Sequence, residues 1–522
     1  FEKIGFKNAI CVKDFPLDDP EFDPDNIKYS CVRYSPSFIA NAMGPSWSDP
    51  RTGEILNASV YLYHNLVGLV RNWRFVQTAQ ADTDVRRKQL PTDILGDCIS
   101  YVVAHEVGHT FAFMHNMAAS SSIPVDSLRS ASFTNKYGTT YSIMDYARNN
   151  YVAQPGDKEK GVRLTPPDLG IYDYFSVKWL YSPIMSAKSS EEEIPILRQW
   201  ISEKLPDPAY RYGRQQIRTR IDPSSFEEDL GDDPVKASSY GVMNLKYILS
   251  QMNEWIKDDV EGDFRKEIYN EIIGQYIRYI NNVLFNIGGI YVNEHYEGDP
   301  FPSYVPVTKE KQRESLKFLW EQALDCSWID EPALQKILPL HSNLSSVIEN
   351  LIIDYVLKRF PSVAICGDKM EQNPYTQLDY MDDLYYYMFM VPDKKNVLSA
   401  SEKNMQLKFV SYLMNGIKTV KKGSAAGTSG RMLTDERIPL PEGIVAPTYL
   451  YDGPLNHFND PKEVMGFEDT VSVTIPVESM EHHYYSMLRK IERLAKNRMS
   501  AGSDENRTHY RLLVYKISQS LK

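Results

Sequence analysis

The sequence predicts an α+β protein in which a small mixed sheet and one long helix precede a mostly helical half. Up to about residue 75, apolar residues form short strand-like runs bounded by turn formers. A helical pattern begins near residue 92, and after residue 233 apolar residues recur at spacings of three and four. We therefore expect a domain of sheet and helix at 1–185, an acidic, proline-containing connector at 186–233 and a mostly helical domain at 234–522.

Composition excludes several classes of protein. The chain has 522 residues, 42% hydrophobic and 24% charged, which is typical of globular proteins. Its 58 basic and 69 acidic residues give a formal charge of −11, the wrong sign for neutralising phosphates, so nucleic acid is not an expected partner. No run approaches the ~18 apolar residues of a membrane-spanning helix. The five cysteines are too widely spaced for a disulfide framework or a Cys-x-x-Cys metal site.

The strand-like runs at the start of the chain are short. They cover Ala9–Val12, Tyr29–Tyr34 and Glu54–Tyr63, and the last run follows the turn-forming segment Asp49–Gly53. We expect these runs to form one small sheet.

The first long helix is predicted to begin at Thr92 or Asp93, because either side chain can cap a helix. Its apolar positions are Leu95, Ile99, Val102, Val103 and Val107. A second helix is expected after Thr165–Asp168, running toward Leu180.

The segment Ser186–Asp233 contains prolines and acidic runs, which is typical of a connector rather than a core. Beyond it, Asp233 and Pro234 form a good cap and first-turn pair. Amphipathic stripes follow and indicate packed helices rather than cofactor sites. Their positions are Leu245, Ile248, Leu249, Met252 and Ile256; Phe264, Ile268, Ile272, Tyr276, Tyr279 and Val283; and Leu344, Val347, Ile348, Leu351, Ile352 and Tyr355.

The chemical signal lies inside the first long helix, where the sequence reads His105-Glu106-Val107-Gly108-His109. Residues four apart share a helix face, so His105 and His109 can bind one ion while Glu106 projects toward its open position. A catalytic zinc ion usually takes a third protein ligand, and His115 is the candidate. The chain must leave the helix near Ala112 for His115 to fold back. A downstream glutamate is the weaker alternative, since none occurs between Glu106 and Glu159.

These residues resemble the metzincin zinc endopeptidases. The family motif is His-Glu-x-x-His-x-x-Gly-x-x-His followed by a turn containing methionine, and the chain has both parts, with Ala112 in place of glycine and Ser142-Ile143-Met144-Asp145-Tyr146 as the turn. The resemblance implies that Met144 forms a hydrophobic floor beneath the metal and that Tyr146 can approach the metal or the reacting carbonyl. Asp145 has two open interpretations, orienting a ligand imidazole or stabilising the turn.

Over most of its length the chain is similar to a family of large bacterial zinc-dependent metalloproteases with a Met-zincin domain. Further matching segments are Asp49–Ile55, Asp222–Ser224, Glu228–Asp233 and Thr508–Tyr510. Such proteins usually have an additional N-terminal region and an export signal. The resemblance therefore implies an extracytoplasmic protein that is secreted, periplasmic or anchored to the cell surface.

The expected function is that of a zinc endopeptidase acting on proteins or peptides, with Glu106 as general base and Tyr146 as the group that stabilises the oxyanion. In the family an extended substrate pairs with a sheet edge. We expect that edge in Glu54–Tyr63, at Ile55, Asn57 and Ser59. The segment Ala147–Ala153 is expected to wall a specificity pocket.

Two other functions remain open: a surface binding protein that keeps the protease fold with little or no turnover, and a peptidase restricted to short peptides. The acidic segment Asp222–Asp233 is a weaker candidate for Ca²⁺, because it clusters carboxylates but lacks the EF-hand spacing. Cys98 lies beyond ligand reach of His105 along the helix and is expected to be a small buried side chain.

Overall fold

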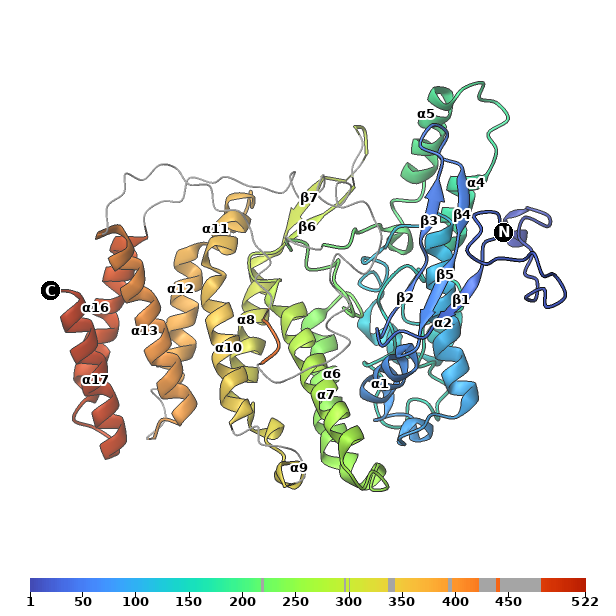
Figure 1. Ribbon diagram of the computed structural model, residues 1–522. Helices are drawn as coiled ribbons and strands as arrows, with labels where there is room; N and C mark the ends of the chain where they lie inside the picture. The colour runs from blue at the N-terminus through green and yellow to red at the C-terminus, as the bar shows by residue number, and fades with distance from the viewer. Residues whose placement is uncertain are drawn as a thin grey trace.

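The computed structural model describes residues 1–216, 220–294, 297–299, 301–336, 343–392, 397–421, 438–441 and 480–522. It confirms the α+β class. Figure 1 shows the strands of the first 63 residues and helix α2 (Thr92–Thr110) at one end of the molecule, with the helices of the C-terminal half following one another toward the other end. The segment Lys422–Arg431, whose composition of Gly, Ser, Ala and Thr predicts a loop, lies outside the described residues.

The main sheet is small and mixed, as predicted. It has the order β1 (Val32–Ser35), β5 (Val60–Tyr63), β2 (Ala42–Met43), with β5 parallel to β1 and antiparallel to β2. Because β5 is paired on both sides, β2 forms one edge of this sheet. Helices α1 (Leu66–Thr78) and α2 pack against each other below it.

Two of the strand predictions are wrong. Ala9–Val12 is irregular and exposed. The expected strand Glu54–Tyr63 is two strands, because the chain exchanges partners at Ser59: β4 (Ile55–Ala58) pairs with β3 (Ser46–Ser48), whereas β5 pairs with β1 and β2. Backbone hydrogen bonds fix this change, with the N–H of Ser59 donating to the carbonyl of Pro45 and the N–H of Val60 to that of Cys31.

Helix α2 begins at Thr92 and ends at Thr110, so its start is predicted correctly, but Pro91 occupies the cap position and neither Thr92 nor Asp93 caps the helix with its side chain. Ala112 then adopts the left-handed conformation with φ 61°, which turns the chain out of the helix. The bend near this residue is therefore confirmed. Further on, α3 (Ala131–Tyr137) is short, and the predicted helix toward Leu180 is α4 (Ile171–Tyr181).

The segment 186–233 is not a simple connector, which corrects the prediction. It contains helix α5 (Ser190–Ser202), and every residue from 220 to 231 is buried. The charges are tolerated inside because they are paired: Arg220 contacts Glu227 at 2.6 Å, and Glu228 is shared by Arg148 and Arg278. This acidic stretch is therefore part of the core beneath the sheet-and-helix region.

The C-terminal half is mostly helical, and the predicted stripes fall on α6, α7 and α10. Asp233 caps α6 by accepting from the N–H groups of Val235 and Lys236. The helices are α6 (Pro234–Trp255), α7 (Asp263–Leu284), α8 (Lys309–Leu324), α9 (Pro332–Gln335), α10 (Leu344–Lys358), α11 (Phe360–Asp368), α12 (Gln377–Tyr385), α13 (Ala400–Lys421), α16 (Glu481–Arg498) and α17 (Asp504–Ser520). The remaining short elements are strands β6 (Ile290–Val292) and β7 (Tyr304–Pro306), a π-helical turn at Tyr386–Met390, and 3-10 turns at Glu2–Ile4, Thr83–Val85, Val125–Arg129, Pro208–Tyr210 and Ser327–Ile329.

One hydrophobic core runs through this half and extends into α1 through Phe75, Val76 and Ala79. Packing is thus continuous across the predicted boundary at residue 185. Among the described helices, none combines the length and the apolar character needed to cross a bilayer.

Candidate metal centre

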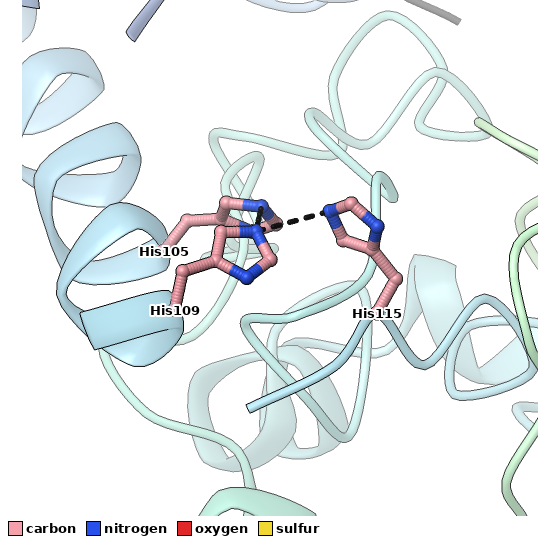
Figure 2. A group of neighbouring side chains, drawn as sticks. All are labelled: His105, His109 and His115. Atoms are coloured by element: carbon pink, nitrogen blue, oxygen red, sulfur yellow. Dashed lines mark hydrogen bonds between the residues drawn. The ribbon is translucent and has the colours of Figure 1, made fainter. Parts of the chain in front are cut away.

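Three histidine side chains converge at the C-terminal end of α2. The Nε2 atom of His109 lies 3.2 Å from the Nε2 atom of His105 and 3.2 Å from that of His115. Figure 2 shows His105 and His109 projecting from the helix and His115 facing them from the chain that follows it. Each residue offers one ligand atom, and these atoms all lie within 4.8 Å of one another.

The left-handed turn at Ala112 places the third histidine. Two backbone hydrogen bonds close the turn, from the N–H of Ala112 to the carbonyl of His109 at 2.9 Å and from the N–H of Phe113 to the carbonyl of Gly108 at 3.1 Å. A left-handed alanine costs roughly 1–2 kcal/mol relative to its usual conformation. The chain thus reaches the geometry without the glycine found in the family motif.

Backbone carbonyls orient two of the rings. The Nδ1 atom of His105 lies 2.6 Å from the carbonyl of Ile143, and that of His109 lies 2.9 Å from the carbonyl of Phe113. A carbonyl can only accept, so each Nδ1 carries the proton and each Nε2 presents a lone pair. Burial lowers the pKa of His105 to about 3 and that of His109 to about 4, so both imidazoles are neutral at physiological pH.

This donor set fits a zinc ion. Two ligands on a tetrahedral zinc with Zn–N bonds of about 2.0–2.1 Å are about 3.3–3.4 Å apart, close to the two observed separations of 3.2 Å. Because the proton of each ring is on Nδ1, neither Nε2 of His105 or His109 has a proton to donate to the other. Two lone pairs that face each other at this distance are suited to binding one cation. Three imidazoles with one position left over are typical of a catalytic zinc site.

The structure gives no support for calcium. Across the described ranges, His105, His109 and His115 are the only group of three potential metal ligands that meets the geometric requirement. In the acidic segment, Asp222 accepts hydrogen bonds from Ser224 and lies near Arg211, while Glu227 and Glu228 face arginines. The carboxylates that were predicted to bind Ca²⁺ are thus neutralised by arginine side chains of the protein.

Met144 lies against the helix that bears the histidines. Its side chain is 2% exposed, and a Cβ added at Gly108 would fall 2.3 Å from its sulfur. Asp173 holds the turn that presents Met144, accepting from the hydroxyl of Ser142 at 2.7 Å and from the N–H of Ile143 at 3.0 Å. The placement is consistent with a floor beneath the metal.

Asp145 is hydrogen-bonded to groups other than the imidazoles. Its Oδ2 accepts from the N–H of Ser120 at 2.7 Å and from the hydroxyl of Thr140 at 3.0 Å. It therefore ties the methionine turn to the loop that follows His115. Of the two interpretations left open by the sequence, this geometry favours stabilising the turn.

Glu106 is buried beside the first ligand. It is 4% exposed, and its Oε2 has no hydrogen-bond partner among the described residues. Burial raises the pKa of Glu106 to about 8, and a hydrogen bond from the backbone of Gly44 opposes that rise. A cation held by the three histidines would lower this pKa and favour the carboxylate form that a general base needs.

Tyr146 packs on the ligand rings. Its ring centroid lies 5.3 Å from that of His105 and 4.7 Å from that of His115. The structure thus brings Tyr146 to the metal centre, as the sequence predicts.

The geometry does not favour the predicted substrate strand. Asn57 and Ser59 are buried, and the amide of Asn57 donates to the carbonyls of Ile27 and Tyr29. Ile55 belongs to the outer pair β3–β4, and β5 is central. Strand β2 reaches Glu106 through Gly44, the residue directly after it. The alternating pattern of residues 54–63 does not reveal which strand becomes an edge.

Two cavities of about 340 Å³ lie beside elements that carry the centre, although the three histidines, Glu106 and Tyr146 line neither of them. The first lies along α2 at Tyr101 and Ala104, with Trp73, Arg148 and Asn149 on its walls. The segment Ala147–Ala153 is predicted to wall a pocket, and two of its seven residues, Arg148 and Asn149, line this cavity. The second adjoins Met144 and the turn at Ala112–Met114, facing aromatic residues of α4.

Sequence reasoning missed Gly44, Asp173 and the carbonyls of Ile143 and Phe113. The carbonyls leave no mark in a sequence because every residue has one. Gly44 lies far from the motif along the chain, and its contact with α2 is a tertiary one. Asp173 occupies the third position of α4, where its carboxylate also accepts from the N–H of Gly170, so a capping pattern was the only available signal.

Comparison with known proteins agrees with this geometry. A family model described as Met-zincin matches residues 87–396, which is more than half of the chain and includes the three histidines, the methionine turn and the first helices of the C-terminal half. No match was found among curated proteins or among solved structures. The family implies a metalloprotease-type function and zinc as the metal. The match and the convergent histidines together show that the chain belongs to the Met-zincin family.

Proposed function

We propose that the protein is a zinc-dependent endopeptidase in which His105, His109 and His115 hold the metal and Glu106 is the general base. The observation that supports this most strongly is the convergence of three imidazole Nε2 atoms directly beside a buried carboxylate, one oxygen of which has no partner in the described part of the chain.

When bound, zinc supplies Lewis-acid polarisation of a carbonyl and makes water more acidic. In the proposed reaction Glu106 accepts a proton from the attacking water and then delivers it to the leaving amine nitrogen. Its buried Oε2 is the oxygen with capacity to accept, since it makes no other hydrogen bond among the described residues.

Tyr146 is proposed to stabilise negative charge on the carbonyl oxygen. Its ring is held against His105 and His115, so its position is set by the same residues that set the metal. Removing a donor of this kind typically lowers kcat by about 10²- to 10³-fold.

The substrate is proposed to lie along β2, the edge strand that reaches Glu106 through Gly44, because main-chain pairing holds a peptide extended with little demand on its sequence. The cavity along α2 is the proposed pocket for a neighbouring substrate side chain. The guanidinium of Arg148 lies 3.8 Å from the ring of Trp73 in the wall of this cavity, so a flat or polar side chain would find contacts there.

The competing function is a binding protein without turnover. Retention of a buried Glu106 beside the metal ligands opposes it, because burying a carboxyl group with an unsatisfied oxygen is costly unless that oxygen is used.

The test is mass-spectrometric mapping of cleavage in an unfolded protein mixture, with zinc as the only added metal and Glu106→Ala as the matched inactive variant. The proposal expects internal cleavage that disappears in the variant and on chelation. Cleavage confined to short peptides would indicate the restricted peptidase. Absence of cleavage by a zinc-loaded chain would contradict the proposal.

A further inference from the structure

Gly44 makes an unusually close contact with the backbone of Glu106. A Cβ at position 44 would lie 2.1 Å from the carbonyl oxygen of Glu106 and 3.2 Å from its Cα. Real side chains do not approach backbone atoms this closely, so only glycine fits here without displacing the strand or the helix. The end of β2 is thus packed directly on the turn of α2 that bears the proposed base.

The pairing of β2 aims the amide of Gly44 at this helix. Met43 pairs with Tyr61 in the antiparallel register, and the N–H of Tyr63 donates to the carbonyl of Asn41. Because backbone groups alternate in direction along an antiparallel strand, Asn41 and Met43 face β5, whereas Ala42 and Gly44 face outward. The N–H of Gly44 therefore points away from the sheet, and it is near enough to the carboxylate of Glu106 to lower the pKa of that group against the rise that burial causes.

The amide is also held rigidly. Pro45 follows Gly44, and a residue before proline is restricted to extended conformations. The carbonyl of Pro45 accepts from the N–H of Ser59, and the hydroxyl of Tyr63 lies 3.1 Å from the sulfur of Met43. The chain is thus fixed on both sides of Gly44.

We propose that Gly44 is a positioning residue: its backbone N–H holds one carboxylate oxygen of Glu106, and its missing side chain allows the approach, so that Oε2 is left directed at the reacting water. This inference rests on the proposed function and deepens it. It assigns the end of β2 a purpose besides pairing with substrate, which is to lock the general base before substrate arrives.

Two variants test the two parts of the proposal. Gly44→Ala adds the Cβ that pushes the strand end away from Glu106. Replacement of Gly44 by glycolic acid, introduced by in vitro translation, exchanges the N–H for an ester oxygen without adding a side chain. Gly96→Ala is the matched control, because Gly96 lies on the same helix and a Cβ there meets no atom within 4 Å.

Steady-state cleavage of a peptide found by mapping would be measured together with thermal unfolding and the absorption spectrum of the Co²⁺-loaded protein. A misplaced catalytic group costs up to about 10²-fold in rate, and loss of a hydrogen bond to a carboxylate costs about 10- to 100-fold. We expect both Gly44 variants to lose kcat by roughly 10- to 100-fold, with KM, the cobalt spectrum and, for the ester, the unfolding midpoint close to those of the wild type. Gly96→Ala should match the wild type in kcat, KM and cobalt spectrum, and its unfolding midpoint should be equal or higher because alanine favours a helix.

Three results would overturn the inference while leaving the proposed function intact. They are a kcat of the ester protein within threefold of the wild type, an equal loss of kcat in Gly96→Ala, and a loss of kcat that is fully accounted for by lost Co²⁺ binding. If Gly44→Ala does not fold, the ester protein alone decides. A wild-type chain that cleaves nothing would instead remove the proposed function, and the inference with it.

Discussion

Glu228→Gln tests whether the buried acidic segment supports the metal centre. Glu228 is fully buried and pairs with Arg148, four residues after Met144, and with Arg278 of α7 at 3.3 Å. The side-chain amide of Gln77 donates to the other carboxylate oxygen of Glu228 at 2.6 Å, and the backbone N–H of Glu228 donates to the carbonyl of Tyr146. The substitution keeps the shape of the side chain and removes the negative charge that two guanidinium groups share.

Removing one partner of a buried ion pair typically costs about 3–5 kcal/mol, because the remaining charge loses its compensation away from water. We expect a loss of this size in the free energy of unfolding, measured by urea denaturation of the zinc-loaded protein. Zinc affinity should fall as well, since Tyr146 belongs to the turn that contains Met144 and Arg148 follows that turn in the chain.

The matched control is Glu505→Gln. Glu505 pairs with Lys403 at 2.7 Å, but the side chain of Glu505 is 81% exposed. The unfolding midpoint of the Glu505→Gln protein should therefore equal that of the wild type. A Glu228→Gln protein that unfolds within about 1 kcal/mol of the wild type would refute the reasoning, because it would mean that the buried network contributes no more than a surface pair.

Three further predictions concern the turns and the helical half. Gly108→Ala places a Cβ 2.3 Å from the sulfur of Met144, and we expect it to cost about 1–3 kcal/mol and to weaken zinc binding in a competition titration, whereas Gly96→Ala should do neither. Ala112→Gly removes the left-handed strain at φ 61° and should raise the free energy of unfolding by up to about 1 kcal/mol with zinc binding retained; a loss of stability would contradict the strain argument. His509 is buried with its Nε2 2.8 Å from the amide oxygen of Gln406, and burial lowers its pKa from 6.5 to about 4. The unfolded chain therefore takes up the proton first, so stability should be full above about pH 6.5 and decline as the pH falls toward about 4, and this decline should be smaller in His509→Gln when urea midpoints are compared at both ends of the range.

Local patterns predicted the part of the site that lies on one helix. Helical spacing places His105 and His109 on one face, and the need for a third ligand located the bend at Ala112, where the structure has its left-handed turn. The methionine turn followed from the motif. These predictions succeeded because each depends on residues close together in the chain.

Predictions that depended on distant partners failed. The acidic run at 227–229 resembles a solvated surface, and only the fold brings Arg148, Arg220 and Arg278 to it. The alternation across 54–63 is continuous, so it does not show the exchange of partners at Ser59. Gly44 has no local signal, since its requirement for glycine comes from the backbone of α2.

The central claim is that three histidines hold one zinc ion that peptide hydrolysis requires. The most direct measurement is the cleavage rate of metal-free protein during stepwise addition of zinc, with His115→Ala and the exposed-histidine control His482→Ala in parallel. The account predicts that the rate rises in proportion to added zinc and levels off at about one ion per chain, that His482→Ala behaves in the same way, and that His115→Ala stays inactive at this ratio. A rate that does not depend on zinc, or a fully active His115→Ala, would contradict it.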